Sequence, residues 1–466
     1  MIRRVGQGQF SGLIRVPPSK SHTIRALIIA SLANGVSEIR YPLDSLDISS
    51  CVNACRVLGA EITEKRSTEP LCPNPPASDG TKLCAYTVKG NAGFKDAIVA
   101  VEKGEGFFDV GNSGTTLFFA MAAAAISPQK FRITGDEQIQ KRSAAPLLEA
   151  LCAFGAKAES VLHNGCAPLL IQGPLKGGKA RLSCPTSQYL SALLIAAPLA
   201  PAGTLATIEV PLLNERPYVE MTLAWLNSQG IPWQASGDFS YFAIPGGASW
   251  SAFNRAIPGD FSSAAFPAAA AAISGGKVTI VGLDPDDAQG DKYFLKMLAQ
   301  MGCTVEWEKT GNCGGEWAVN VSRNGPMHGG TFDLNATPDL LPAAAVCAAF
   351  ASGDTALVNV AHARIKETDR IAAMAKELAK LGVNCTEKPD ALVVHGTGGK
   401  FSGLGCPACV IDSQGDHRIA MAFAAAAQGL PAPIEIEGAE CADVSYPGFW
   451  ELVEGKNIFY KDEYNE

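Results

Sequence analysis

One pattern recurs six times along this 466-residue chain: a polar or glycine-rich turn leads directly into an apolar, alanine-rich segment. The equivalent positions in the six copies are Ser21, Ser113, Ser187, Ser262, Asp339 and Asp416. The intervals between them are nearly equal apart from a longer first one, and so regular a period is typical of a repeated structural unit. The first interval contains the proline-rich segment 67–80, which we interpret as a surface insertion. The repeat therefore predicts a chain built from six similar modules.

Each module combines helices with short β-rich segments. The first helix of a module is apolar nearly all round, which indicates burial, whereas the second has apolar residues at helical spacing on one side, as in 371–382. Five of the second helices run into a glycine, the residue that favours the left-handed conformation beyond a helix C-terminus: Gly59, Gly155, Gly230, Gly302 and Gly382. The pattern predicts an α/β fold in which the six polar turns converge if the first helices all point one way.

Composition excludes several classes of protein. With 47% hydrophobic and 18% charged residues the chain is globular rather than disordered. A formal net charge of −8 argues against general nucleic-acid binding, although a local basic cleft could still hold small anions. The longest apolar run, 189–200, is too short to cross a bilayer, and the first residues lack the apolar stretch of a signal peptide. We therefore expect a cytoplasmic protein that does not bind membranes.

The 14 cysteines are scattered through apolar segments, where free cysteine behaves as a small hydrophobic residue. Cys406 and Cys409 form one CxxC pair, but no second pair stands at zinc-site spacing. We therefore expect no metal site.

The first polar turn, in segment 17–35, places Lys20, Ser21 and Arg25 at the start of an apolar helix. These residues could form a solvated first turn. They could also form an anion site, because a helix N-terminus offers free N–H groups and the positive end of the helix dipole. Taken alone, the stretch favours the solvated turn, since charged first turns are common.

Five motifs identify the chain more closely: SKSHTIR at 19–25, GNSGTT at 111–116, TSQ at 186–188, RIKETDR at 364–370 and GDHR at 415–418. Together with the six modules they resemble the enolpyruvyl transferase family over nearly the whole chain. The resemblance implies a two-domain inside-out α/β barrel with three repeats per domain. Domain I would comprise residues 1–17 and 258–466, and domain II residues 18–257.

Within that family the motifs are similar to those of members that transfer the enolpyruvyl group of phosphoenolpyruvate to the 5-hydroxyl of 3-phosphoshikimate. The resemblance implies small-molecule substrates, no metal or organic cofactor, and a monomer. Two alternatives remain. One is transfer to UDP-N-acetylglucosamine, although such members typically have Lys-Asn where this chain has Lys20-Ser21. The other is a ligand-binding relative without catalytic activity.

The resemblance also implies roles for individual residues. The 3-phosphoshikimate site would use Lys20, Ser21, Arg25, Thr186, Ser187, Gln188, Asp339 and Lys366. The phosphoenolpyruvate site would use Lys20, Asn112, Gly114, Arg142, Gln188, Arg370 and Arg418. The residues implied to be catalytic are Asp339 at the 5-hydroxyl, Glu367 at the enolpyruvyl carbon, and Lys20. Plainer interpretations are that Asp339 only caps a helix, and that Arg370 only pairs with Glu367 on its own helical turn.

The chain departs from the family pattern at four positions. Phe118 stands where many members have arginine, Glu215 where many have serine, and His362 where many have asparagine. Val444 stands where many carry a lysine that binds phosphoenolpyruvate. Because the last change removes a cation, we expect an active enzyme with weaker phosphoenolpyruvate binding.

Overall fold

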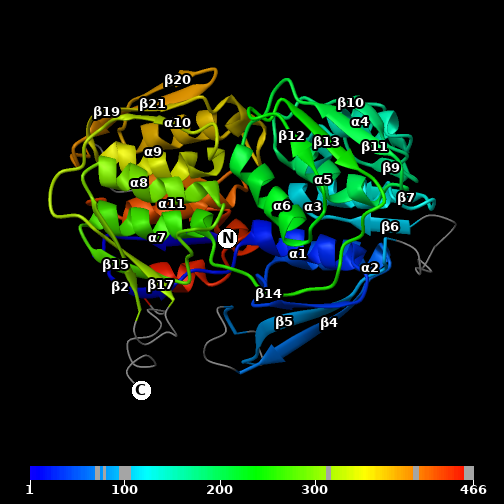
Figure 1. Ribbon diagram of the computed structural model, residues 1–466. Helices are drawn as coiled ribbons and strands as arrows, with labels where there is room; N and C mark the ends of the chain where they lie inside the picture. The colour runs from blue at the N-terminus through cyan, green and yellow to red at the C-terminus, as the bar shows by residue number, and fades with distance from the viewer. Residues whose placement is uncertain (69–73, 77–79, 94–105, 311–315, 402–408, 456–466) are drawn as a thin grey trace. The chain divides into compact units, whose positions relative to one another are not determined.

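The computed structural model describes residues 1–68, 74–76, 80–93, 106–310, 316–401 and 409–455 (Figure 1). Contacts between Cα atoms divide the chain into two compact units. Unit 1 comprises Met1–Pro17 and Pro258–Glu466, and unit 2 comprises Pro18–Ile257. Among the described helices, none is both long and apolar enough to cross a membrane.

The described part of unit 2 contains three four-stranded sheets with three pairs of helices. The strand orders are β14-β3-β5-β4, β6-β7-β9-β8 and β10-β11-β13-β12. The strands are β3 (Val36–Arg40), β4 (Glu61–Ser67), β5 (Lys82–Lys89), β6 (Gly106–Asp109), β7 (Phe131–Thr134), β8 (Lys157–Ser160), β9 (Leu169–Gln172), β10 (Gly178–Arg181), β11 (Leu205–Glu209), β12 (Gln234–Ala235), β13 (Tyr241–Pro245) and β14 (Asn254–Ala256). The helices are α1 (Lys20–Leu32), α2 (Leu46–Val57), α3 (Gly114–Ala124), α4 (Ala145–Ala153), α5 (Gln188–Ala196) and α6 (Arg216–Ser228).

The described part of unit 1 has two four-stranded sheets, β16-β17-β15-β2 and β18-β19-β21-β20, and one three-stranded sheet, β1-β23-β22. Its strands are β1 (Ile2–Val5), β2 (Gly12–Arg15), β15 (Lys277–Val281), β16 (Thr304–Lys309), β17 (Trp317–Ser322), β18 (Thr331–Asp333), β19 (Ser352–Val358), β20 (Cys385–Lys388), β21 (Ala391–Thr397), β22 (Cys409–Asp412) and β23 (Ile434–Glu437). Its helices are α7 (Phe261–Ser274), α8 (Tyr293–Gln300), α9 (Leu341–Phe350), α10 (Arg370–Lys380), α11 (His417–Ala427) and α12 (Phe449–Val453).

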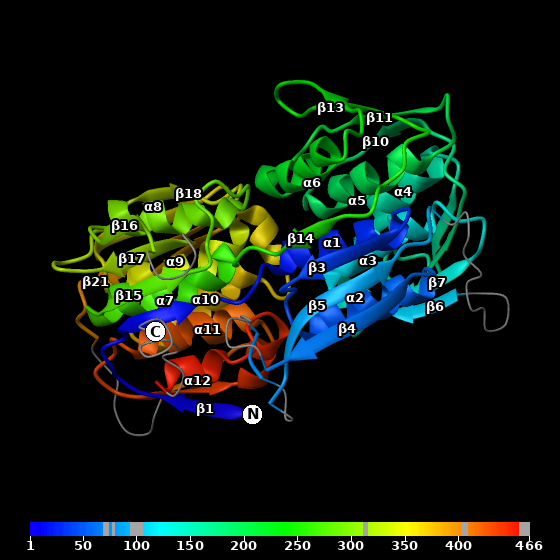
Figure 2. The same cartoon turned by 60° about the horizontal axis from the view of Figure 1, so that its bottom comes forward.

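The first helix of each repeat is buried, as its composition predicts. In unit 1 the helices α7, α9 and α11 pack against one another inside the unit (Figure 2). Every residue of α9 is buried, as is every residue of α11. Alanine suits such a position because it has the highest helix propensity and lets neighbouring helices approach closely. In unit 2, α3 packs against both α1 and α5. The predicted α/β fold class with six sheet-and-helix units is confirmed.

The glycines at the ends of the second helices adopt the predicted left-handed conformation. Gly59, Gly155, Gly230, Gly302 and Gly382 all have positive φ, between 64° and 98°. After α2 the N–H of Ala60 donates to the carbonyl of Cys55 and the N–H of Gly59 to that of Arg56, the two hydrogen bonds of a Schellman motif. These glycines end the helices and return the chain to the next strand.

Both units complete their sheets with strands that lie far away in the sequence. In unit 2, β14 pairs in parallel with β3, although the two strands stand at opposite ends of the unit's sequence. In unit 1, β2 pairs in parallel with β15, and β1 pairs antiparallel with β23. Segment Met1–Pro17 therefore contributes strands to two different sheets of unit 1.

Candidate functional site

In unit 2 the predicted residues gather at the N-terminal ends of α1, α3 and α5. The Nζ of Lys20, at the start of α1, lies 3.1 Å from Oδ2 of Asp47 in α2. The Nε2 of Gln188, at the start of α5, donates to Oγ1 of Thr115 in α3 over 2.8 Å. The second contact joins the polar turns before α3 and α5, which belong to successive repeats. Asp47 was not among the predicted site residues, because no motif pointed to it.

The glycine-rich turn before α3 holds an arginine against its backbone. A Cβ atom on Gly114 would lie 2.5 Å from Nη1 of Arg142, closer than real Cβ contacts allow. The guanidinium of Arg142 therefore rests on the turn only because residue 114 has no side chain. The nearby Asn112 donates through Nδ2 to Oδ2 of Asp136 and Oε1 of Gln138. A cation and a helix N-terminus thus meet at this turn, the combination that binds anions.

Arg25 is almost entirely buried, and protein groups surround its guanidinium. Nε donates to Thr222 over 2.9 Å, Nη1 to the carbonyl of Ser21 over 3.0 Å, and Nη2 to the carbonyl of Tyr218 over 2.7 Å. Burial lowers the pKa of Arg25 to about 10. Because this value is still above neutral pH, the side chain stays charged. In this arrangement Arg25 ties α1 to α6.

The TSQ turn also engages a protein group. Glu215, which immediately precedes α6, accepts hydrogen bonds from Thr186 and Ser187 at the start of α5. The sequence marks Glu215 only as a departure from the family pattern, without indicating where its carboxylate lies.

In unit 1, Arg370 binds three carboxylates that come from three different segments of the sequence. Its Nη1 lies 2.7 Å from Oδ1 of Asp339, its Nη2 2.5 Å from Oε2 of Glu367, and its Nε 2.7 Å from Oδ2 of Asp416. The expected alternative of an Arg370–Glu367 pair on one helical turn is therefore present. Because Arg370 and Asp416 are both buried, however, the group is an internal charge network rather than a surface ion pair.

Asp339 is held between two arginines. It lies in the 3₁₀ helix η4 (Pro338–Leu340), and its Oδ2 accepts from Nη2 of Arg418 over 2.8 Å while Oδ1 accepts from Arg370. Its carboxylate makes none of the cap hydrogen bonds at the start of α9, so the helix-cap interpretation is wrong. Burial alone would raise the pKa of Asp339, but the charges of Arg418, Lys366 and Arg370 outweigh burial and hold that pKa well below its usual range.

A further buried carboxyl group, Asp291, lies in the short 3₁₀ helix η3 (Gly290–Lys292), and no motif pointed to it. Its Oδ2 accepts a very short hydrogen bond from Ser262 of α7, while its Oδ1 has no hydrogen-bond partner among the described residues. Burial and the negative charge of Asp339 raise the pKa of Asp291 to about 7, although Arg418 opposes them. The charged group of unit 1 thus includes one carboxyl that takes up a proton near neutral pH.

The other three departures from the family pattern lie in three different helices. Phe118 is buried in α3 and packs edge-on against Tyr189, with ring centroids 4.8 Å apart. His362 is buried in the 3₁₀ helix η5 (Ala361–Ile365), and Val444 ends the 3₁₀ helix η6 (Ala439–Val444). Phe118 is thus a core residue of α3.

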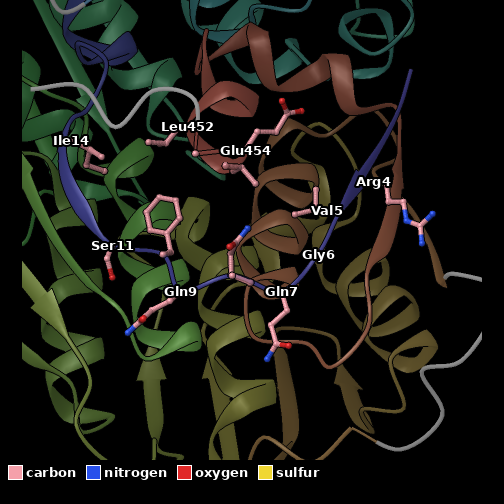
Figure 3. Close-up of a pocket in the computed structure, with 14 residues that line it drawn as sticks. Arg4, Val5, Gly6, Gln7, Gln9, Ser11, Ile14, Leu452 and Glu454 are labelled. Carbon is pink, nitrogen blue, oxygen red and sulfur yellow. The ribbon is translucent and has the colours of Figure 1, made fainter.

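Among the described residues, no three histidine, cysteine, aspartate or glutamate side chains gather as a metal-binding group. Cys406 of the CxxC pair lies outside the described residues. A cavity of about 330 Å³ lies in unit 1 near the N-terminal strands and α12 (Figure 3). Its lining includes Arg4, Gln7, Gln9, Ser11, Leu452 and Glu454 but none of the predicted site residues, so it is not the candidate site.

Comparison with known proteins identifies the family. Residues 5–453 match the model of EPSP synthase (3-phosphoshikimate 1-carboxyvinyltransferase). The chain belongs to the EPSP synthase family. It is 42% identical to the 3-phosphoshikimate 1-carboxyvinyltransferase of Acetivibrio thermocellus, with 96% of each chain covered. It is 40% identical to the enzyme of that name from Ruminiclostridium cellulolyticum, covering 97% of this chain and 98% of that one.

A solved structure agrees with these relatives. The EPSP synthase of Acinetobacter baumannii superposes with a TM-score of 0.76 at 26% identity, and 98% of each chain is covered. The family predicted from the five motifs is therefore confirmed.

Proposed function

We propose that this chain transfers the enolpyruvyl group of phosphoenolpyruvate to the 5-hydroxyl of 3-phosphoshikimate. The products are 5-enolpyruvylshikimate 3-phosphate and inorganic phosphate, in the pathway to chorismate and the aromatic amino acids. In the addition step the hydroxyl oxygen bonds to C2 of phosphoenolpyruvate while C3 gains a proton. In the elimination step C3 loses a proton and the C2–phosphate bond breaks.

The observation that carries the proposal is the position of Asp339 between Arg370 and Arg418. Arg370 also pairs with Glu367. The reaction needs a base for the hydroxyl and an acid for the methylene carbon. It also needs fixed cations for phosphate and carboxylate groups. The carboxylates and arginines of this network are the required residue types, and the network links two of the quoted motifs, RIKETDR and GDHR, with the polar turn that contains Asp339.

The two substrates are strongly anionic, so their binding requires positively charged side chains. The two substrates together bring roughly six negative charges at neutral pH, since each carries a phosphate and a carboxylate. We propose that unit 2 contributes Lys20, Arg25 and Arg142 toward their binding. Unit 1 contributes Lys366, Arg370 and Arg418. Asn112, Gly114, Ser21 and the TSQ turn add polar contacts.

The two carboxylates would have separate tasks. Asp339 is ionised at neutral pH but is a weak base while Arg370 and Arg418 stabilise its charge. Substrate anions that pair with those arginines reduce this stabilisation and raise the proton affinity of Asp339, which then accepts the proton of the 5-hydroxyl. Glu367 would deliver and later remove the proton at C3 of the enolpyruvyl group.

We further propose that the protein acts as a cytoplasmic monomer on these small molecules, without nucleic-acid or membrane partners and without a metal or organic cofactor. The net charge of −8 supports the exclusion of nucleic acid.

The test is a coupled assay of phosphate released from phosphoenolpyruvate, with 3-phosphoshikimate, UDP-N-acetylglucosamine or no acceptor. We expect release only with 3-phosphoshikimate. Release only with the UDP-sugar would assign the chain to the alternative acceptor. Binding of 3-phosphoshikimate without any release would indicate a non-catalytic relative.

A further inference from the structure

The start of α5 is an anion site that a side chain of the protein already occupies. Oε2 of Glu215 accepts hydrogen bonds from Oγ of Ser187 over 2.8 Å, from the backbone N–H of Ser187 over 3.0 Å and from Oγ1 of Thr186 over 3.2 Å. These donors stand at the N-terminus of a nine-residue helix, where the helix dipole also favours negative charge. One carboxylate oxygen therefore takes both hydroxyls and a backbone donor of this turn.

Glu215 is buried and has an unusual backbone conformation, so its contact with the TSQ turn is not that of a loose surface side chain. The residue is 2% exposed, and a buried carboxylate needs hydrogen bonds or opposite charges to compensate for lost hydration. Its backbone has φ 58° and ψ 40°, the left-handed region that residues other than glycine, asparagine and aspartate rarely adopt. The three hydrogen bonds offset an unfavourable backbone conformation. An exposed, unconstrained glutamate would show neither feature.

The inference rests on the proposed function, in which the donors of Thr186 and Ser187 serve the phosphate of the acceptor. Thr186 and Ser187 are expected to bind the phosphate of 3-phosphoshikimate. A phosphate and a carboxylate cannot share these donors, because like charges within a few ångströms repel and each hydroxyl has one proton to donate.

We propose that the Glu215 carboxylate occupies the phosphate subsite of the acceptor and that 3-phosphoshikimate binds by displacing it. Glu215 is thus a specificity-determining residue. It lowers the affinity for the phosphorylated acceptor and satisfies the TSQ turn when the subsite holds no ligand. Because the competition concerns the phosphate alone, Glu215 has no effect on phosphoenolpyruvate or on the chemical step.

The test compares Glu215→Ser and Glu215→Asn with the wild-type protein. Asparagine tolerates the left-handed backbone and controls for loss of fold in the serine variant. Glu220→Ser is the matched control for charge, since Glu220 lies in α6, the helix that directly follows Glu215, and is half-exposed in a pair with Arg216. For each protein the kcat and the KM for both substrates are measured, together with calorimetric Kd values for 3-phosphoshikimate and unphosphorylated shikimate.

We expect Glu215→Ser to lower the KM and Kd for 3-phosphoshikimate about tenfold or more, because a charge-assisted contact no longer has to be broken. The kcat, the KM for phosphoenolpyruvate and the Kd for shikimate should stay within about twofold. Glu220→Ser should match the wild type. A higher Kd for 3-phosphoshikimate, or equal changes for shikimate, would overturn the inference, because Glu215 would then be a binding or merely structural residue.

A crystal structure of the wild-type protein with 3-phosphoshikimate decides the question without any substitution. The inference requires the phosphate to accept the hydrogen bond from the Ser187 N–H in place of Glu215. It is wrong if Glu215 still accepts this hydrogen bond in the complex. The outcome is separable from that of the proposed function. A wild-type protein that releases no phosphate with 3-phosphoshikimate refutes the function. An active wild type with unchanged phosphate affinity in both variants refutes only the role of Glu215.

Discussion

Arg370 and Asp416 form an ion pair that is almost completely shielded from solvent, with Nε of the arginine 2.7 Å from Oδ2 of the aspartate. Asp416 also caps α11, where its Oδ1 accepts the backbone N–H of Arg418 over 2.8 Å. The pair thus connects the start of α10 with the start of α11. It fixes the two arginines that hold Asp339.

Arg370→Met should destabilise the protein by about 3–5 kcal/mol, because it leaves the Asp416 carboxylate buried without its partner. The control is Arg216→Met, which breaks the half-exposed pair with Glu220 and should cost less than about 1 kcal/mol. Urea unfolding followed by circular dichroism measures both values. A loss for Arg370→Met no larger than that of the control would show that the buried pair contributes little.

Asp339→Asn and Glu367→Gln should each lower kcat by roughly 10²-fold or more, because each removes a proton-transfer group. Steady-state phosphate release measures the effect, and calorimetry should show smaller changes in substrate affinity. Glu387→Gln is a suitable control. Glu387 lies in β20, is partly exposed and pairs with Arg364. If either site variant turned over like the control, that residue would have no part in proton transfer.

Asp291→Asn should stabilise the protein increasingly as the pH rises from about 4 to 7. In the folded state the pKa of Asp291 is about 7, whereas in the unfolded chain an aspartate titrates near 4. Between these values the unfolded wild type releases a proton that the folded state retains, so the wild type loses stability with rising pH. The gain of the variant should level off above about pH 7, at no more than about 4 kcal/mol.

Thermal unfolding of Asp291→Asn and wild type across pH 4–8 measures this difference. The exposed Asp284→Asn controls for the removal of a negative charge on the segment between β15 and η3. A difference between Asp291→Asn and wild type that does not vary with pH would show that Asp291 is ionised throughout.

Gly114→Ala should raise the KM for phosphoenolpyruvate by about tenfold, because the new methyl group displaces the guanidinium of Arg142. The fold should be unaffected, since the contact is the end of a flexible side chain. Gly237→Ala is the control, as a Cβ there meets no atom within 4 Å. An unchanged KM in Gly114→Ala would mean that Arg142 does not bind phosphoenolpyruvate from this turn.

Much of the fold could be predicted from the sequence because its determinants are local. The alanine-rich first helices, their polar turns and glycines such as Gly59 and Gly382 each act within a few residues, and all appear as predicted. The pairing of β1, β2 and β14 with strands far away in the sequence has no such local signal, because it depends on the complete fold.

For the candidate site, the sequence proposes which residues take part but not how they contact one another. The family resemblance pointed to Asp339, Glu367, Arg370 and Arg418, yet it could not show that one arginine binds three carboxylates. Asp291 carried no signal, since its interaction with Asp339 joins residues that are distant in sequence. Glu215 could be recognised as unusual, but only the left-handed backbone places its carboxylate on the TSQ turn.

The pairing of β1 with β23 also constrains the order of events during protein synthesis. Unit 2 is continuous, so all its strands have left the ribosome once Ile257 has emerged. β1 is made first but must wait for β23, which lies near the other end of the chain. Because synthesis adds about 5–20 residues per second, this delay lasts on the order of tens of seconds. During that time the nascent chain carries a finished unit 2 between two incomplete portions of unit 1, whose unpaired strand edges are natural binding sites for chaperones.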